Sequence, residues 1–137
     1  MGPQSPVGLK ALGGLVRAED RDTGDHLIGT PADHLKLALL GRIPATGAMQ
    51  KVELHISTEL VASQSRVEPN HDFAPPPPGY TLFGAGIDTE LGRRQSVRVG
   101  VDAHNLLNTA YREYSSLLRY YADQPGRDVR VRIGMDF

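Results

Sequence analysis

The sequence predicts an all-β protein, an antiparallel up-and-down meander of about six strands. From residue 128 to the end, every odd position from Val129 to Phe137 is apolar, and every even position from Asp128 to Asp136 is charged or glycine. Such strict alternation is typical of a two-faced β-strand. Glycine and proline make up 15 and 10 of the 137 residues, which argues against a helical bundle because both residues break helices. Short and long connections also alternate along the chain.

The other five strands are expected, in chain order, at residues 7–17, 35–39, 52–62, 80–91 and 96–103. Alternation is clear in the last three of these segments. It is only partial over residues 7–17, and Leu40 breaks it after residues 35–39. Short connections are expected at residues 42–47 and 92–95, and long polar ones at residues 19–33, 66–79 and 112–127. Several long loops are uncommon in compact soluble domains, whereas membrane barrels have tight turns at one end and long loops at the other.

Composition excludes several functions. The 15 Lys and Arg against 16 Asp and Glu give a net charge of −1, which does not favour a nucleic-acid partner. The absence of cysteine excludes disulfides, thiolate metal sites and cysteine nucleophiles. Neither a catalytic triad, a supported pair of acid–base carboxylates nor a phosphate-binding glycine loop is present, so we expect no enzyme activity and no cofactor. The first residues do not resemble a secretory signal peptide.

The apolar strand faces could meet lipid in a membrane barrel or a second sheet in a soluble β-sandwich binding module. Alternation fits both. Aromatic residues are only 6% of the chain, so a two-sheet core would be poorly filled. Most of them lie near strand ends, as in the aromatic girdles of barrels: Tyr80, Tyr111, Tyr114, Tyr120, Tyr121 and Phe137. On physical grounds both alternatives stay open, whereas a complete small barrel needs about eight strands.

One segment carries a family resemblance. Asn105, Leu106, Asn108 and Tyr111 stand in a stretch that resembles the "NLFNxxYR" segment of TonB-dependent outer-membrane receptors, with Leu107 in place of the usual Phe. Residues 78–82, Pro-Gly-Tyr-Thr-Leu, resemble a strand opening of that family, and residues 22–34 resemble a loop that precedes another strand. The resemblance extends over nearly the whole chain.

The resemblance implies that residues 1–137 form the C-terminal part of a barrel of about 22 strands, without the N-terminal plug domain. The six strands would be transmembrane and would form an open segment of that barrel. The whole receptor would take up a metal chelate, siderophore-like, or a similar nutrient across the outer membrane, and this part alone would be inactive. Implied partners are outer-membrane lipid and the barrel-assembly machinery, which would read Phe137 as its signal. The TonB complex would be contacted only through the missing N-terminal part.

Three histidines are weak candidates for metal ligands. His26, His34 and His71 each lie next to an aspartate in a predicted outer loop, and imidazole and carboxylate both bind zinc and iron. Their spacing matches no ligand pattern, so ordinary loop residues are the favoured interpretation. His55 and Glu59 are expected on the polar face of one strand, as residues lining the barrel interior. The prolines at residues 75–78 are expected to stiffen the approach to the next strand.

Overall fold

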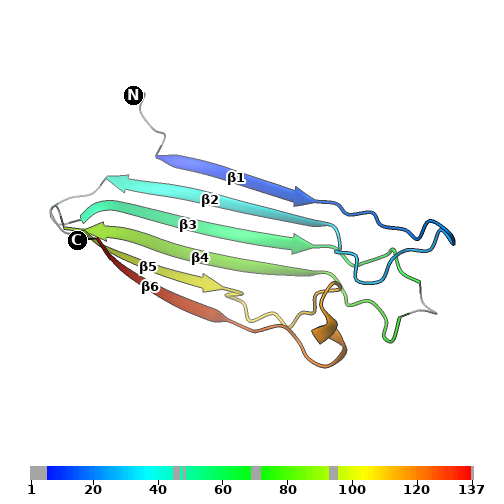
Figure 1. The fold of residues 1–137 in the computed structure, drawn as a ribbon. Coiled ribbons are helices and arrows are strands. Elements are labelled where there is room, and N and C mark those ends of the chain that lie inside the picture. The colour runs from blue at the N-terminus through cyan, green and yellow to red at the C-terminus, as the bar shows by residue number, and fades with distance from the viewer. Residues whose placement is uncertain (1–5, 45–46, 48, 69–71, 93–95, 137) are drawn as a thin grey trace.

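The computed structural model describes residues 6–44, 47, 49–68, 72–92 and 96–136. They form one six-stranded antiparallel sheet, in which each strand pairs with its neighbours in the sequence (Figure 1). The strands are β1 (Val7–Gly14), β2 (His34–Pro44), β3 (Met49–Val61), β4 (Tyr80–Leu91), β5 (Ser96–His104) and β6 (Asp128–Asp136). Among the described residues the only helical element is a short 3-10 helix, η1 (Leu117–Tyr120), in the last loop. The predicted all-β meander is therefore confirmed.

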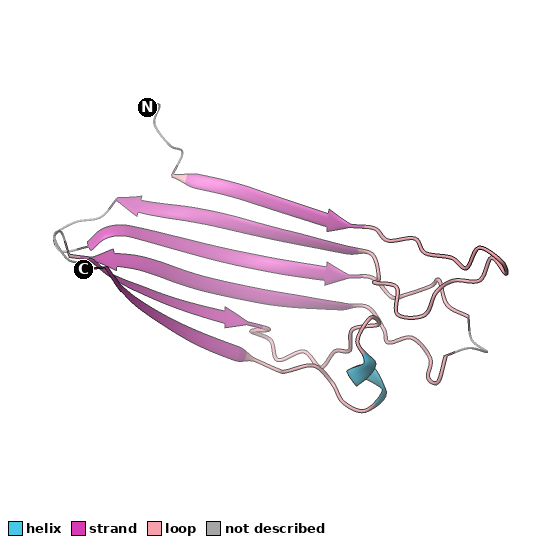
Figure 2. Cartoon of the chain, viewed as in Figure 1, coloured by secondary structure: helices cyan, strands magenta, loops and turns pink. Residues whose placement is uncertain are grey.

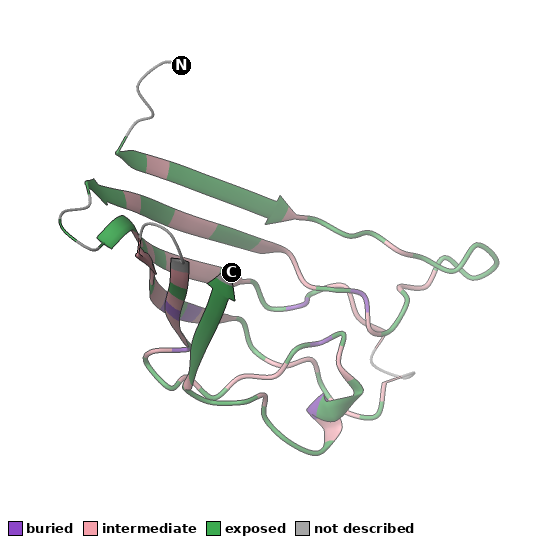
Figure 3. Ribbon diagram, turned by 60° about the vertical axis from the view of Figure 1, so that its left-hand side comes forward, coloured by how far each residue is buried: buried purple, intermediate pink, exposed green. Residues whose placement is uncertain are grey.

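The sheet is open, with β1 and β6 as its two edges (Figure 1). Seen from a second direction, it is a single twisted layer, and no other part of the described chain covers either face (Figure 3). An uncovered edge exposes a row of backbone donors and acceptors that another strand could pair with.

The connections divide between the two ends of the sheet, as the sequence predicts. Two short connections, β2 to β3 and β4 to β5, lie at one end, which we call the turn end (Figure 2). The three long loops, residues 15–33, 62–79 and 105–127, lie together at the other, and we call them the loop layer. Because the number of strands is even, β1 begins and β6 ends at the turn end (Figure 1).

Strand boundaries differ from the prediction mainly in β1, β2 and β3. β3 begins at Met49 rather than at residue 52. β1 ends at Gly14 rather than at residue 17, and β2 continues through Leu40 into the predicted turn. Leu40 pairs with Gly8 on one side and with His55 on the other. Its side chain lies 3.7 Å from the place where a Cβ of Gly8 would stand, which is ordinary van der Waals contact. β2 thus carries a large apolar side chain, Leu40, on its polar side.

Few side chains are buried, and most of these are polar and belong to the loop layer. The buried apolar side chains are Leu82 of β4 and Tyr114, and the buried polar ones are Thr30, Gln64, Asn105 and Arg119. The sheet therefore has no hydrophobic core of the usual kind on either face. Within the described residues, no helix has the length and apolar character needed to cross a membrane.

Candidate functional site

One face of the sheet carries no charged residue on any strand. The strand register places on this apolar face the odd-numbered positions of β1, β2, β4, β5 and β6 and the even-numbered positions of β3 from Val52 onward. All of these residues are aliphatic, Phe, Met, Thr, Ala or Gly. Their side chains are widely exposed, with 76% for Leu9, 62% for Ile56 and 68% for Ile133. The sheet therefore presents a continuous apolar surface to whatever surrounds it.

The opposite face, the polar face, carries the strands' charged residues, and several of them form cross-strand ion pairs. Lys36 Nζ lies 3.0 Å from Glu59 Oε1, and Arg42 Nε lies 2.8 Å from Glu53 Oε1. His55 Nε2 lies 3.2 Å from Asp102 Oδ1, and Asp102 Oδ2 lies 2.6 Å from Arg132 Nη2. The expectation that His55 and Glu59 lie on the polar face is confirmed.

Glycines let these long side chains lie flat on the polar face. A Cβ added to Gly86 would stand 2.2 Å from the His55 ring and 2.8 Å from Asp102. A Cβ on Gly100 would stand 2.4 Å from Asp88 and 3.2 Å from Arg132. The glycines of β4 and β5 are thus explained by close approach of neighbouring side chains.

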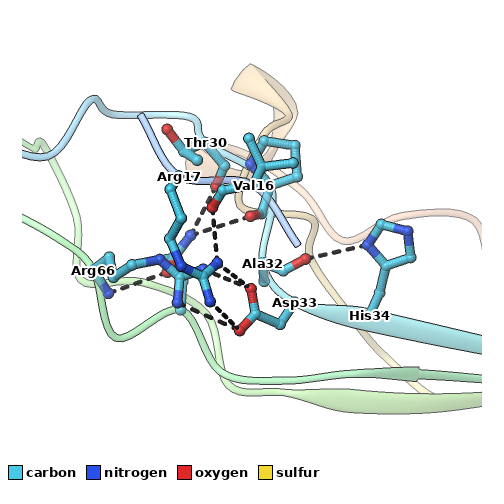
Figure 4. A network of polar contacts seen from close by, with 9 residues as sticks. Val16, Arg17, Thr30, Ala32, Asp33, His34 and Arg66 are labelled. Atoms are coloured by element: carbon cyan, nitrogen blue, oxygen red, sulfur yellow. Dashed lines mark hydrogen bonds and ion pairs between the residues drawn. The ribbon is translucent and has the colours of Figure 1, made fainter. Parts of the chain in front are cut away.

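Two arginines and one aspartate join the first long loop to the second (Figure 4). Arg17 donates to both oxygens of Asp33, at 2.7 and 3.1 Å, and Arg66 Nη2 donates to Asp33 Oδ1 at 2.8 Å. The hydrogen bonds from Arg17 and then Arg66 lower the pKa of the Asp33 carboxyl. Close by, the buried Gln64 side chain donates to the Thr30 carbonyl at 2.8 Å, so the loops are joined at two places.

A second cluster joins the second long loop to the third. Arg119 Nη2 lies 2.5 Å from Asp72 Oδ2, with side-chain exposures of 3% and 4%. Tyr120 and Tyr114 donate to the same carboxylate at 2.7 and 3.2 Å. Burial alone raises the pKa of Asp72, but the hydrogen bonds from Arg119 and Tyr120 outweigh it and lower that pKa to about 2. This cluster could not be predicted from the sequence, because only an arginine near tyrosines hints at it and Asp72 stands 47 residues away in the chain.

The residues of the family resemblance build the turn at which β5 ends. Asn105 is fully buried at a φ of +50°, its side chain donates to the Thr109 carbonyl at 2.9 Å, and it accepts from the Thr109 amide at 2.8 Å. Leu106 N–H donates to the Phe83 carbonyl of β4 at 2.9 Å.

Asn108, at a φ of +54°, accepts from the Arg127 amide at 2.9 Å. The Tyr111 ring packs on Tyr80, with centroids 4.6 Å apart. Their role in this structure is to shape the last loop.

Two of the histidine candidates for metal binding, His26 and His34, lie in the described part of the chain and contact different groups. His26 Nδ1 lies 3.6 Å from Glu19, and His34 Nδ1 lies 3.2 Å from the Ala32 carbonyl oxygen (Figure 4 shows His34). Within the described part of the chain, no group of three or more His, Asp and Glu side chains could hold a metal ion. His71 and Phe137 lie outside the described residues.

Comparison of the chain with known protein families, with curated proteins and with solved structures found no match.

Proposed function

We propose that the chain is the C-terminal part of the β-barrel of a TonB-dependent outer-membrane receptor, which takes up a metal chelate or a similar nutrient. The apolar face contacts the membrane hydrocarbon, the polar face lines the barrel interior, and the loop layer faces outward. The six strands alone are too few to close a barrel, so residues 1–137 by themselves are inactive in uptake.

The observation that carries the membrane part of the proposal is the uncharged apolar face of six consecutive strands. A charged side chain on a lipid-facing position near the middle of a bilayer costs roughly 2–4 kcal/mol. Every charged residue of the six strands occupies a polar-face position instead. The division between short turns and long loops adds support, since membrane barrels have this asymmetry.

Membrane contact can be tested with single cysteines, because the chain has none of its own. Ile133→Cys on the apolar face and Gly134→Cys on the polar face stand at nearly the same depth of β6. Each variant, folded in lauryldimethylamine oxide micelles, is labelled with an environment-sensitive fluorophore. We expect a blue-shifted emission at position 133 and a water-like emission at position 134.

The same labels distinguish the alternative, a soluble sandwich module. Such a module would fold in detergent-free buffer with a cooperative melting transition and would shield position 133 from water there. Water-like emission at both positions in micelles would equally contradict the membrane proposal.

The receptor part of the proposal rests on the residues that resemble the family, and it has its own test. The DNA directly upstream of this coding sequence should encode a plug domain and about sixteen further strands in frame, given the roughly 22 strands of the receptor barrel. An unrelated upstream sequence would contradict the proposal that the chain is part of such a receptor. The proposed membrane contact would still be tested by the fluorescence experiment.

A further inference from the structure

The loop layer contains a cavity that the proposed function does not use. Its volume is about 440 Å³, within the range of small-molecule sites. It lies between the second and third long loops and is lined by Pro75–Pro78, Tyr80, Tyr111, Arg112 and Asp123, among others. We propose that this cavity binds a neutral saccharide of one or two rings.

The walls of the cavity suit the flat faces of sugar rings. Tyr80 and Tyr111 are in contact with each other, with centroids 4.6 Å apart and planes inclined by 43°. The four prolines form a second apolar wall with little conformational freedom. The C–H groups on one side of a pyranose ring can pack against such aromatic and proline surfaces. The hydroxyl groups of the sugar lie at the edge of the ring, so they keep their hydrogen bonds in this arrangement.

The polar groups of the cavity offer a donor beside an acceptor. Arg112 Nε donates to Asp123 Oδ1 at 2.5 Å, and Arg112 Nη1 donates to the Arg119 carbonyl at 2.8 Å. Among the described residues, Arg112 Nη2 and Asp123 Oδ2 make no hydrogen bond. Adjacent sugar hydroxyls both donate and accept, so they match a guanidinium beside a carboxylate.

The charges of the cavity favour a neutral ligand. Arg112 and Asp123 compensate each other, and Arg119 is neutralised by Asp72. An anionic ligand at Arg112 would be repelled by Asp123, and a cationic ligand at Asp123 would be repelled by Arg112. The burial of Tyr111 and the nearby Glu113 raise the pKa of its phenol, which therefore stays neutral at physiological pH.

The site is held in shape before a ligand arrives. The Asp72–Arg119 ion pair connects the two loops that form the cavity, and the Gln124 amide donates to the Tyr111 carbonyl at 2.9 Å. Such preorganisation lowers the entropy lost on binding. The inference goes beyond the proposed function, because it concerns what the loop layer binds and does not depend on what covers the apolar face.

The test is saturation-transfer NMR on the full chain in lauryldimethylamine oxide micelles, a detergent without a sugar headgroup. The probes are methyl glucoside, methyl galactoside, methyl mannoside and maltose, with glucuronate and glucosamine as ionised counterparts. We expect saturation of the ring C–H protons of at least one neutral sugar, and weaker saturation of the ionised ones. Tyr111→Ala should weaken binding by about tenfold or more, the usual effect of removing an aromatic anchor.

Two further variants separate recognition from a general disturbance of the loop. Asp123→Asn keeps the shape of the side chain and should weaken binding because the charged acceptor is lost. Tyr121→Ala removes an 85% exposed ring of the same loop outside the cavity lining and should leave binding unchanged. Near-UV circular dichroism of the tyrosines verifies that the loop layer is ordered in each sample. No saturation of any neutral sugar, equal binding by wild type and Tyr111→Ala, stronger binding of glucuronate, or a wild type without ordered tyrosines would each overturn the proposal.

Discussion

Arg119 and Asp72 stand 47 residues apart in the chain, yet their side chains form an ion pair that is almost completely buried. The rings of Tyr114 and Tyr120 lie over the guanidinium, at 4.4 and 4.2 Å from their centroids. Both faces of the sheet are uncovered, so the buried residues lie mostly in the loop layer. This ion pair is one of the few places in the described chain from which water is excluded. It therefore holds two long loops in a fixed arrangement.

Replacing Arg119 should open the loop layer and leave the sheet intact. Arg119→Met leaves Asp72 buried without its counterion, and breaking a buried ion pair costs roughly 3–5 kcal/mol. Hydrogen exchange should accelerate at the Tyr121 and Gln124 amides, which donate to carbonyls of the same loop, and remain slow in β3 and β4. The matched control is Arg130→Met, because Arg130 is 75% exposed and its pair with Asp128 contributes at most about 1 kcal/mol. Equal protection in both variants would show that the buried pair does not hold the loops.

The loop layer should lose stability in acid. The pKa of Asp72 lies at about 2 in the folded chain, below its ordinary value of 3.8, so folding favours the ionised carboxylate. This contribution is complete above the ordinary value and decreases as the pH falls from about 4 towards about 2. The near-UV circular dichroism of the tyrosines should be constant from neutral pH down to about 4.5 and decline below about 4.

Asp72→Asn provides the control for this acid transition. The amide cannot titrate, so this variant should show a weaker tyrosine signal at neutral pH and a smaller change between about 4 and about 2. Asp33 remains to titrate in the variant, since its pKa is also lowered. An unchanged acid transition in Asp72→Asn would assign the effect to other groups.

Asn105 should be essential to the turn after β5. Asn105→Ala removes two hydrogen bonds to Thr109 and leaves partly buried backbone groups unpaired, at a cost of about 1–3 kcal/mol. Asn105→Gly loses the same bonds but accepts the φ of +50° more easily, so it should be less destabilising by about 1 kcal/mol. Exchange of the Thr109 amide measures both effects. If the two variants behave alike, the backbone conformation contributes little.

A charge on the apolar face should be tolerated far less than one on the polar face. Ile133→Arg places a cation near the middle of β6, where we propose lipid contact, and it should weaken folding into bilayer vesicles by roughly 2–4 kcal/mol. Gly134→Arg is its matched control, because a Cβ there meets no atom within 4 Å. Vesicle binding and protease protection measure both variants, and similar losses in the two would contradict the assignment of the faces.

The sheet could be predicted from the sequence because alternation is a local signal. The alternation predicts a strand at residues 80–91, and the structure has a strand with these boundaries. The last three strands also keep their apolar and polar sides as the sequence predicts. The weak segment at residues 35–39 became an 11-residue strand because pairing on both sides outweighs the interruption at Leu40.

The loop layer could not be predicted in the same way. Asp72 and Arg119 come from different loops, as do Asp33 and Arg66, and no periodic pattern connects the partners. Their contacts depend on how the sheet brings three loop ends together. A long polar loop in the sequence gives no sign of whether it is ordered by such pairs.

The even number of strands has a practical consequence for work with this chain. Val7 and Asp136, where the first strand begins and the last one ends, lie on the side of the short turns. A purification tag or fluorescent protein fused directly before Val7 or directly after Asp136 would start from that same side. The opposite side, with its cavity, would stay unobstructed, so antibodies or ligands could be applied there while the molecule is immobilised by its ends.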